Sequence, residues 1–149
     1  MGPADRLPLP AALQASTGFL LSKAAQRALA AVEAALRPLG IRTRQYGVLA
    51  ALAEACSLSQ HALGEGLRVD RTTMVALVND LERLGLAARH RLLDDRRAYA
   101  LQLTAGGTTL LERAREAVAT AEGSLSGALS AAERYQLRDL LQRLLWRQA

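Results

Sequence analysis

The sequence predicts a mainly α-helical fold with one small β-hairpin. Half of the 149 residues are hydrophobic and only 3% are aromatic, a composition that favours packed helices over an aromatic-rich β-sandwich. Apolar residues recur at helical spacing along most of the chain, and the pattern changes to that of strands only between 86 and 103. This length fits one domain, so we expect 1–149 to form a single domain without a separate catalytic domain.

Two helices are predicted first. Apolar side chains recur at helical spacing over 11–36 and indicate one long helix, which Pro38 ends. Thr43 is a plausible N-cap for a second helix, which reaches about Ala55. A helix pair of unequal length is therefore expected before the middle of the chain.

Two shorter helices are predicted next. Ser57 and Gln60 have the spacing of a capping box, which would start a helix at Leu58. Two glycines in its second turn disfavour a long helix here. Asp70 is the N-cap candidate of the following helix, which has apolar residues at i, i+3, i+4 and i+7 and ends at Gly85.

The hairpin is predicted from alternating residues. Ala98–Leu103 places Tyr99, Leu101 and Leu103 on one face of a strand, and Leu86–Arg91 can supply the antiparallel partner. The connection between the two strands is charged at its tip. We expect an exposed, charged hairpin end.

Two more helices should close the chain. Thr104 can cap a helix that runs from Ala105 to about Glu122. After a glycine-containing break, Ser130 and Glu133 have the spacing of a second capping box, which would open a terminal helix with several leucines.

A short helix, a tight connection, an amphipathic helix and a charged hairpin, in that order, form a winged helix-turn-helix, here over 57–103. Its outward residues are short-chained near the start of the amphipathic helix, so that they can approach base edges closely. Threonine and arginine can hydrogen-bond bases or phosphates, and alanine or valine can meet a thymine methyl group. The predicted DNA-contacting residues of the two helices are Arg68, Arg71, Thr72, Thr73, Val75, Ala76 and Asn79.

Several short motifs carry a family resemblance. They are Leu58-Ser59-Gln60-His61-Ala62-Leu63, Val69-Asp70-Arg71-Thr72-Thr73, Leu81-Glu82-Arg83-Leu84-Gly85-Leu86, Arg89, Asp95-Arg96-Arg97, and Leu101-Gln102-Leu103-Thr104 followed by Gly107. On these residues the chain resembles the MarR (multiple antibiotic resistance regulator) family over 10–148. The resemblance implies a homodimer whose helices at 10–36 and 105–148 interlock, with the fourth helix in the major groove and the wing in the flanking minor groove. It also implies a transcriptional regulator, commonly a repressor, on an inverted-repeat operator.

By the same resemblance, the wing tip carries a DNA-reading arginine. Arg97 is that arginine, Asp95 is the carboxylate that positions it, and Arg96 lies nearer to phosphate. A narrow minor groove has an enhanced negative potential and attracts an inserted guanidinium. Arg89 and Arg91, on the first strand of the hairpin, complete the predicted DNA-binding set.

The charge supports this interpretation only weakly. The formal net charge is +5 and the sequence pI is about 10.3, which favours anionic partners. The arginine excess also fits a G+C-rich genome, and over 68–97 seven arginines minus five acids leave only +2. A helical protein-interaction module and a non-specific DNA-binding protein of the same shape therefore stay open as alternatives.

The remaining chemistry-bearing residues predict neither an enzyme nor a metal site. Cys56 is the single cysteine, so no intrachain disulfide forms, and we expect it to be buried and inert. His61 and His90 are isolated, without the ligand spacing of a metal site. No nucleophile with a base and no phosphate-binding loop is apparent, so we expect no catalysis and no cofactor.

An effector site and a location can also be predicted. The resemblance implies a small aromatic or phenolic effector in a crevice between the dimer helices and the DNA-binding lobe, where Arg44 and Tyr46 are candidates. The chain has neither a signal-peptide pattern at its start nor an apolar run of membrane-spanning length. We therefore expect a soluble, cytoplasmic protein with no membrane partner.

Overall fold

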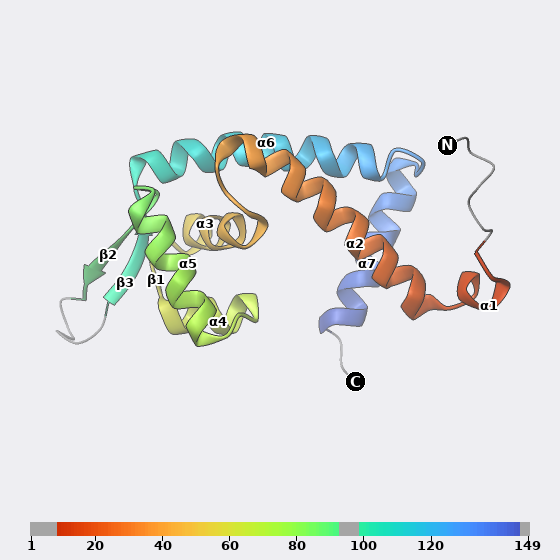
Figure 1. Cartoon of the computed structure of the whole chain (residues 1–149), viewed down its shortest axis with the longest axis horizontal. Helices are drawn as coiled ribbons and strands as arrows, with labels where there is room; N and C mark the ends of the chain where they lie inside the picture. The colour runs from red at the N-terminus through yellow and green to blue at the C-terminus, as the bar shows by residue number, and fades with distance from the viewer. Residues whose placement is uncertain (1–8, 93–98, 147–149) are drawn as a thin grey trace.

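A computed structural model describes residues 9–92 and 99–146. It confirms the mainly helical fold with a small antiparallel sheet (Figure 1). None of the helices in these ranges is long and apolar enough to cross a membrane. In chain order the elements are α1 (Ala11–Gln14), α2 (Thr17–Leu36), η2 (Arg37–Leu39), α3 (Thr43–Ala55), β1 (Leu58–Ser59), α4 (Gln60–Leu67), α5 (Arg71–Arg83), β2 (Ala87–Arg91), β3 (Tyr99–Leu103), α6 (Ala105–Leu125) and α7 (Ala131–Trp146).

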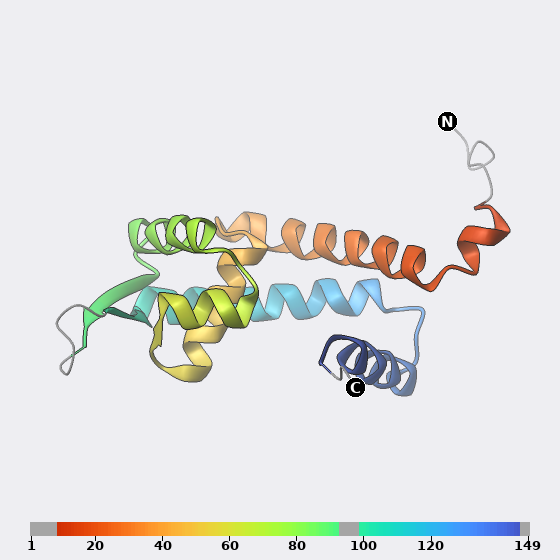
Figure 2. The same cartoon turned by 90° about the horizontal axis from the view of Figure 1, so that it is seen from below.

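The prediction of one unbroken helix over 11–36 was wrong. The chain leaves the helix after Gln14, and Ser16 takes an extended conformation with its hydroxyl accepting a hydrogen bond from the N–H of Phe19 at 3.2 Å. Serine can offer the backbone this alternative to a continuous helix. The long helix α2 therefore begins at Thr17, and it lies alongside α6 (Figure 2).

The hydrophobic core lies where α3, α4, α5 and the sheet meet the adjoining ends of α2 and α6. Its fully buried side chains include Leu36, Leu49, Leu63, Leu81 and Leu111. Away from this lobe the described part of the chain is poorly covered, since α7 contains no buried residue and α2 contains only Leu36. Among the described residues, one end of the molecule is thus a compact lobe, and the other end consists of helices with few buried side chains.

The sheet contains one strand that the sequence did not predict. Its order is β1-β3-β2, and Leu58 and Arg89 lie on opposite sides of Leu101. The predicted capping box at Ser57 was wrong, because Leu58 and Ser59 pair with β3 instead of starting a helix. Helix α4 begins two residues later than expected, and the Ser59 hydroxyl accepts from the N–H of Ala62 at 3.1 Å.

Three predicted caps are confirmed. Asp70 caps α5, and Thr104 caps α6 by accepting from the N–H of Gly107 at 2.9 Å. Ser130 and Glu133 form the reciprocal capping box of α7, with N–H···O distances of 2.7 and 3.2 Å. Helix α6 runs to Leu125, three residues beyond its expected end.

Candidate nucleic-acid interface

The turn between α4 and α5 is closed by a tight backbone contact. The N–H of Val69 donates to the carbonyl of Gly64 at 2.9 Å, and Arg68 has a left-handed conformation with φ 53°. A Cβ on Gly64 would lie 3.1 Å from the Val69 carbonyl oxygen. Gly64 therefore lets the backbone of the turn at Val69 pack closely on α4.

Asp70 holds the start of α5 in place. Its carboxylate accepts from the hydroxyl of Thr73 at 2.6 Å and from the N–H of Thr73 at 2.9 Å. These bonds, the hydroxyl one foremost, hold the pKa of Asp70 below its usual value, so the cap is charged at neutral pH. The Thr73 hydroxyl, a predicted DNA contact, is thus already engaged within the helix start.

Helix α5 presents one face to the core and the opposite face to solvent. Met74, Val78 and Leu81 are buried, as their helical spacing predicted. The residues predicted to face outward are placed as follows: Arg71, Thr72, Ala76 and Asn79 are exposed, and Val75 is half-buried. The exposed face is short-chained near its start and is held rigidly by the core beneath it.

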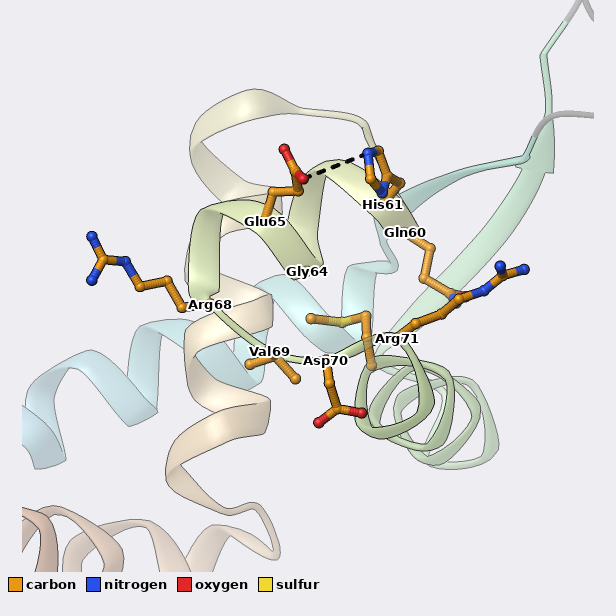
Figure 3. A pocket seen from close by; sticks show the side chains of 9 residues that line it. Gln60, His61, Gly64, Glu65, Arg68, Val69, Asp70 and Arg71 are labelled. Atoms are coloured by element: carbon orange, nitrogen blue, oxygen red, sulfur yellow. Dashed lines mark ion pairs between the residues drawn. The ribbon is translucent and has the colours of Figure 1, made fainter.

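An open hollow of about 730 Å³ lies between α4 and the start of α5 (Figure 3). Arg68 and Arg71 extend from opposite sides of it, and His61 lies 3.8 Å from Glu65 in an exposed pair. The hollow therefore carries charges of both signs. The Arg68 guanidinium is turned toward α7, where its Cζ lies 4.9 Å from the centre of the Trp146 ring.

The arginines of the wing have different surroundings. Arg89 is half-buried and bonded to α4 and α5, through Gln60, Asn79 and Glu82. Arg91 is exposed, and its Cζ lies 5.7 Å from the centre of the Tyr99 ring. The predicted wing-tip residues Asp95, Arg96 and Arg97 lie outside the described residues.

A second hollow, of about 790 Å³, lies between α2, the start of α3 and α5, and two of its lining residues, Thr73 and Ala76, are also predicted DNA contacts. Arg44 lines this hollow, whereas Tyr46, the other candidate for an effector site, packs against the core and is not among its lining residues. Three further charged residues of the wall, Glu33, Arg42 and Asp80, could not be assigned to it from the sequence. The full lining is Leu29, Ala30, Glu33, Arg42, Thr43, Arg44, Gln45, Thr73, Ala76, Leu77 and Asp80.

Glu33 ties the long helix α2 to the lobe. One carboxylate oxygen accepts from the N–H of Thr43 at 3.0 Å and from its hydroxyl at 2.8 Å. The two bonds from Thr43, the backbone one foremost, hold the pKa of Glu33 below its usual value. The charged Glu33 carboxylate of α2 therefore accepts hydrogen bonds from the first residue of α3.

The prediction of a buried cysteine was wrong. Cys56 is exposed, as are Glu54 and Ala55 before it, because the last turn of α3 lies at the surface and the helix ends at Cys56 with φ 60°. His61 and His90 are exposed, as expected for surface histidines. Among the described residues no group of three or more His, Cys, Asp and Glu side chains is placed to hold a metal ion.

Comparison with known proteins assigns the lobe to a family. The model described as "MarR family" matches residues 39–98. A putative transcriptional regulatory protein for the hcr operon of Thauera aromatica is 41% identical over 105 residues. That match spans 70% of this chain and 63% of the relative, so somewhat less than two thirds of the relative is covered.

Solved structures match nearly the whole chain. A MarR-family transcriptional regulator from Rhodococcus sp. RHA1 shares 33% sequence identity over 92% of this chain and 97% of its own, with a TM-score of 0.84. CouR from Rhodococcus jostii RHA1, bound to p-coumaroyl-CoA, shares 32% sequence identity over 94% of this chain and 99% of its own, with a TM-score of 0.83. A mutant MarR from Escherichia coli complexed with operator DNA shares 26% sequence identity over 86% of this chain and 92% of its own, with a TM-score of 0.79. These relatives are regulators rather than enzymes, as the sequence predicted, and the chain belongs to the MarR family of winged helix-turn-helix transcriptional regulators.

Proposed function

We propose that this chain is a repressor that binds an inverted-repeat operator as a homodimer and is released by a small-molecule effector. The observation that carries the proposal is the solvent-exposed, short-chained face of α5 on a buried core. Such a face can enter the major groove and reach base edges. The mutant MarR from Escherichia coli, which has the same fold, was solved with operator DNA.

In this proposal α5 reads the operator and the wing contacts its flanks. Two of the predicted contacts would need a change of partner, since Arg68 now lies against Trp146 and Thr73 is bonded to Asp70. The proposed major-groove residues are Arg71, Thr72, Val75, Ala76 and Asn79. The proposed wing residues are Arg91, with Arg96 and Arg97 positioned by Asp95 at the tip.

The dimer is proposed from the uncovered leucines of the flanking helices. Leu20 and Leu21 of α2 are 47% and 37% exposed, and Leu140 and Leu144 of α7 are 43% and 64% exposed. Clustered exposed apolar residues mark a binding surface, and a second copy would cover these leucines. We assign the surface to the leucine-bearing faces of the helices at 10–36 and 105–148, in a single domain whose DNA-binding lobe is 57–103. A two-fold dimer would select half-sites centred about 10 bp apart.

The effector site is proposed in the hollow between α2, α3 and α5. Its wall combines apolar residues, such as Leu29 and Leu77, with the cations Arg42 and Arg44. Because Leu77 belongs to the DNA-reading helix, a ligand here can favour one placement of α5 over another. CouR, a relative of this fold, was solved with p-coumaroyl-CoA, and we propose a small aromatic or phenolic compound for this chain.

Binding to DNA from upstream of the chain's own coding sequence tests the proposal, against scrambled DNA of the same composition over a salt series. A clear preference for the upstream DNA supports a regulator. Salt-sensitive binding without preference would indicate a non-specific DNA-binding protein, and no binding would indicate an interaction module. Arg71→Ala should weaken specific binding, whereas Arg113→Ala, which removes the same charge from an exposed position on α6, should not.

A further inference from the structure

Arg89 lies where strand β2 meets both helices of the helix-turn-helix. Its guanidinium pairs with the Glu82 carboxylate and donates to the side-chain oxygens of Asn79 at 3.0 Å and Gln60 at 3.3 Å. Its main-chain N–H donates to the other oxygen of Glu82 at 3.0 Å. One carboxylate therefore holds both the backbone and the side chain of Arg89.

This arrangement competes with a phosphate contact. The Arg89 and Glu82 side chains are only 28% and 30% exposed, and the guanidinium fork is directed at partners within the protein. An arginine neutralised by a carboxylate displaces few counterions from DNA, unlike an arginine that meets a phosphate. To reach a phosphate, Arg89 would have to give up Glu82 and two amide oxygens.

The position of Arg89 along the strand is also fixed. Arg89 is paired across the sheet with Leu101, which is buried in the core at 1% exposure. Glu82 and Asn79, by contrast, belong to α5. The bonds of Arg89 therefore join the middle of β2 to the DNA-reading helix.

Arg89 also determines how Asn79 is presented. A guanidinium only donates hydrogen bonds, so the atom of Asn79 that faces Arg89 must be its oxygen. With that oxygen engaged, the Asn79 amide offers its N–H₂ group to DNA. It can then donate to an acceptor on a base edge, whereas the paired donor and acceptor contact that asparagine makes with adenine would require the oxygen to turn away from Arg89 or to accept a second bond.

We infer that Arg89 is a positioning residue, which with Glu82 locks β2 onto α5 and orients Asn79 as a hydrogen-bond donor toward DNA. This inference rests on the proposed DNA-reading function. It assigns Arg89 a different role from the direct contact that the sequence suggested.

Three variants separate positioning from phosphate contact in titrations of the upstream DNA over a salt series. Arg89→Lys keeps the charge but cannot form the fork, Glu82→Gln removes the opposing charge, and Glu116→Gln removes a charge from an exposed site on α6 as a control. We expect Arg89→Lys and Glu82→Gln each to bind about tenfold more weakly, because charge-assisted bonds are lost. The salt dependence should stay that of the wild type, since no phosphate contact is removed.

A phosphate-contacting Arg89 would give the opposite pattern. Lysine would then keep most of the affinity, and Glu82→Gln would bind more tightly than Glu116→Gln because it frees Arg89. Either result would overturn the inference. The preference for one base pair over another at each operator position is a further measurement, which a merely stabilising role of Arg89 would not change. Arg89→Lys and Asn79→Ala should both lose this preference at the same base pair. Loss at different base pairs would count against the inference.

Hydrogen exchange without DNA distinguishes failure of this inference from failure of the proposed function. Amide exchange in β2 should rise in Arg89→Lys and Glu82→Gln but not in Glu116→Gln, at temperatures where all three variants are folded. Unchanged exchange in β2 would overturn the lock. If the wild-type protein shows no preference for the upstream DNA, the proposed function fails while the exchange result still decides the lock.

Discussion

A methyl group at residue 107 should push α6 away from the wing. Gly107 is buried in the first turn of α6, and a Cβ there would lie 1.9 Å from the carbonyl oxygen of Leu86 and 2.9 Å from its carbonyl carbon. Carbon and oxygen normally approach to about 3.3 Å, so one backbone segment would have to move by more than about 1 Å. That carbonyl also accepts from the N–H of Thr104 at 3.1 Å. We predict that Gly107→Ala lowers the free energy of unfolding by about 3 kcal/mol, the upper part of the usual range for overpacking.

The neighbouring glycine provides a matched control. A Cβ on Gly106 would have its nearest contact at 3.5 Å, from the carbonyl oxygen of Gly85, which is ordinary packing. Alanine also favours the helix by up to about 1 kcal/mol over glycine, so Gly106→Ala should be neutral or stabilising. Urea unfolding of both variants at one protein concentration measures the difference, because the stability of a dimer depends on concentration. Equal stability of the two alanine variants would refute the close contact between Gly107 and Leu86.

Three further predictions follow from the flanking helices. Leu144→Glu should sediment as a monomer because it places a charge in the proposed dimer surface. The control Gln142→Glu, at an exposed site on the same helix, should remain dimeric. If both variants sediment as dimers, the proposed surface is contradicted. Arg68→Ala should change the emission of Trp146, the single tryptophan, and an unchanged spectrum would count against their contact. The pKa of Glu33 is lowered in the folded chain, so the stability it adds is present above the usual carboxyl pKa of about 4 and is lost as pH falls through the lowered value. The thermal midpoint of the wild type should therefore exceed that of Glu33→Gln by less at pH 3 than at pH 7. An equal difference in thermal midpoint at the two pH values would exclude a stabilising role of the Glu33 charge.

Local signals were sufficient for much of the fold. The Asp70 cap, the periodicity of Met74, Val78 and Leu81, and the capping box at Ser130 each depend on residues within one or two helical turns. Such interactions can be recognised from spacing alone. They located the exposed face of α5 and hence most of the candidate DNA-binding surface.

The errors arose where distant segments decide the structure. Leu58 joins a strand because β3, more than forty residues later, has a free edge for it. Cys56 is exposed because the last turn of α3, with Glu54 and Ala55, lies at the surface, and which part of α3 is covered depends on the elements packed against it. Arg89 resembled a DNA contact by its position, but its partners Gln60 and Glu82 come from two other elements. The spacing of residues within one helix or strand cannot show which residues of another helix or strand they will contact.

A hydroxyl-radical footprint on the upstream DNA tests most directly the claim that a homodimer reads an inverted repeat through α5. The account predicts two equivalent protected patches with centres about 10 bp apart, and Arg71→Ala should weaken both patches equally. A single patch, or continuous protection that follows protein concentration along the whole fragment, would contradict the account.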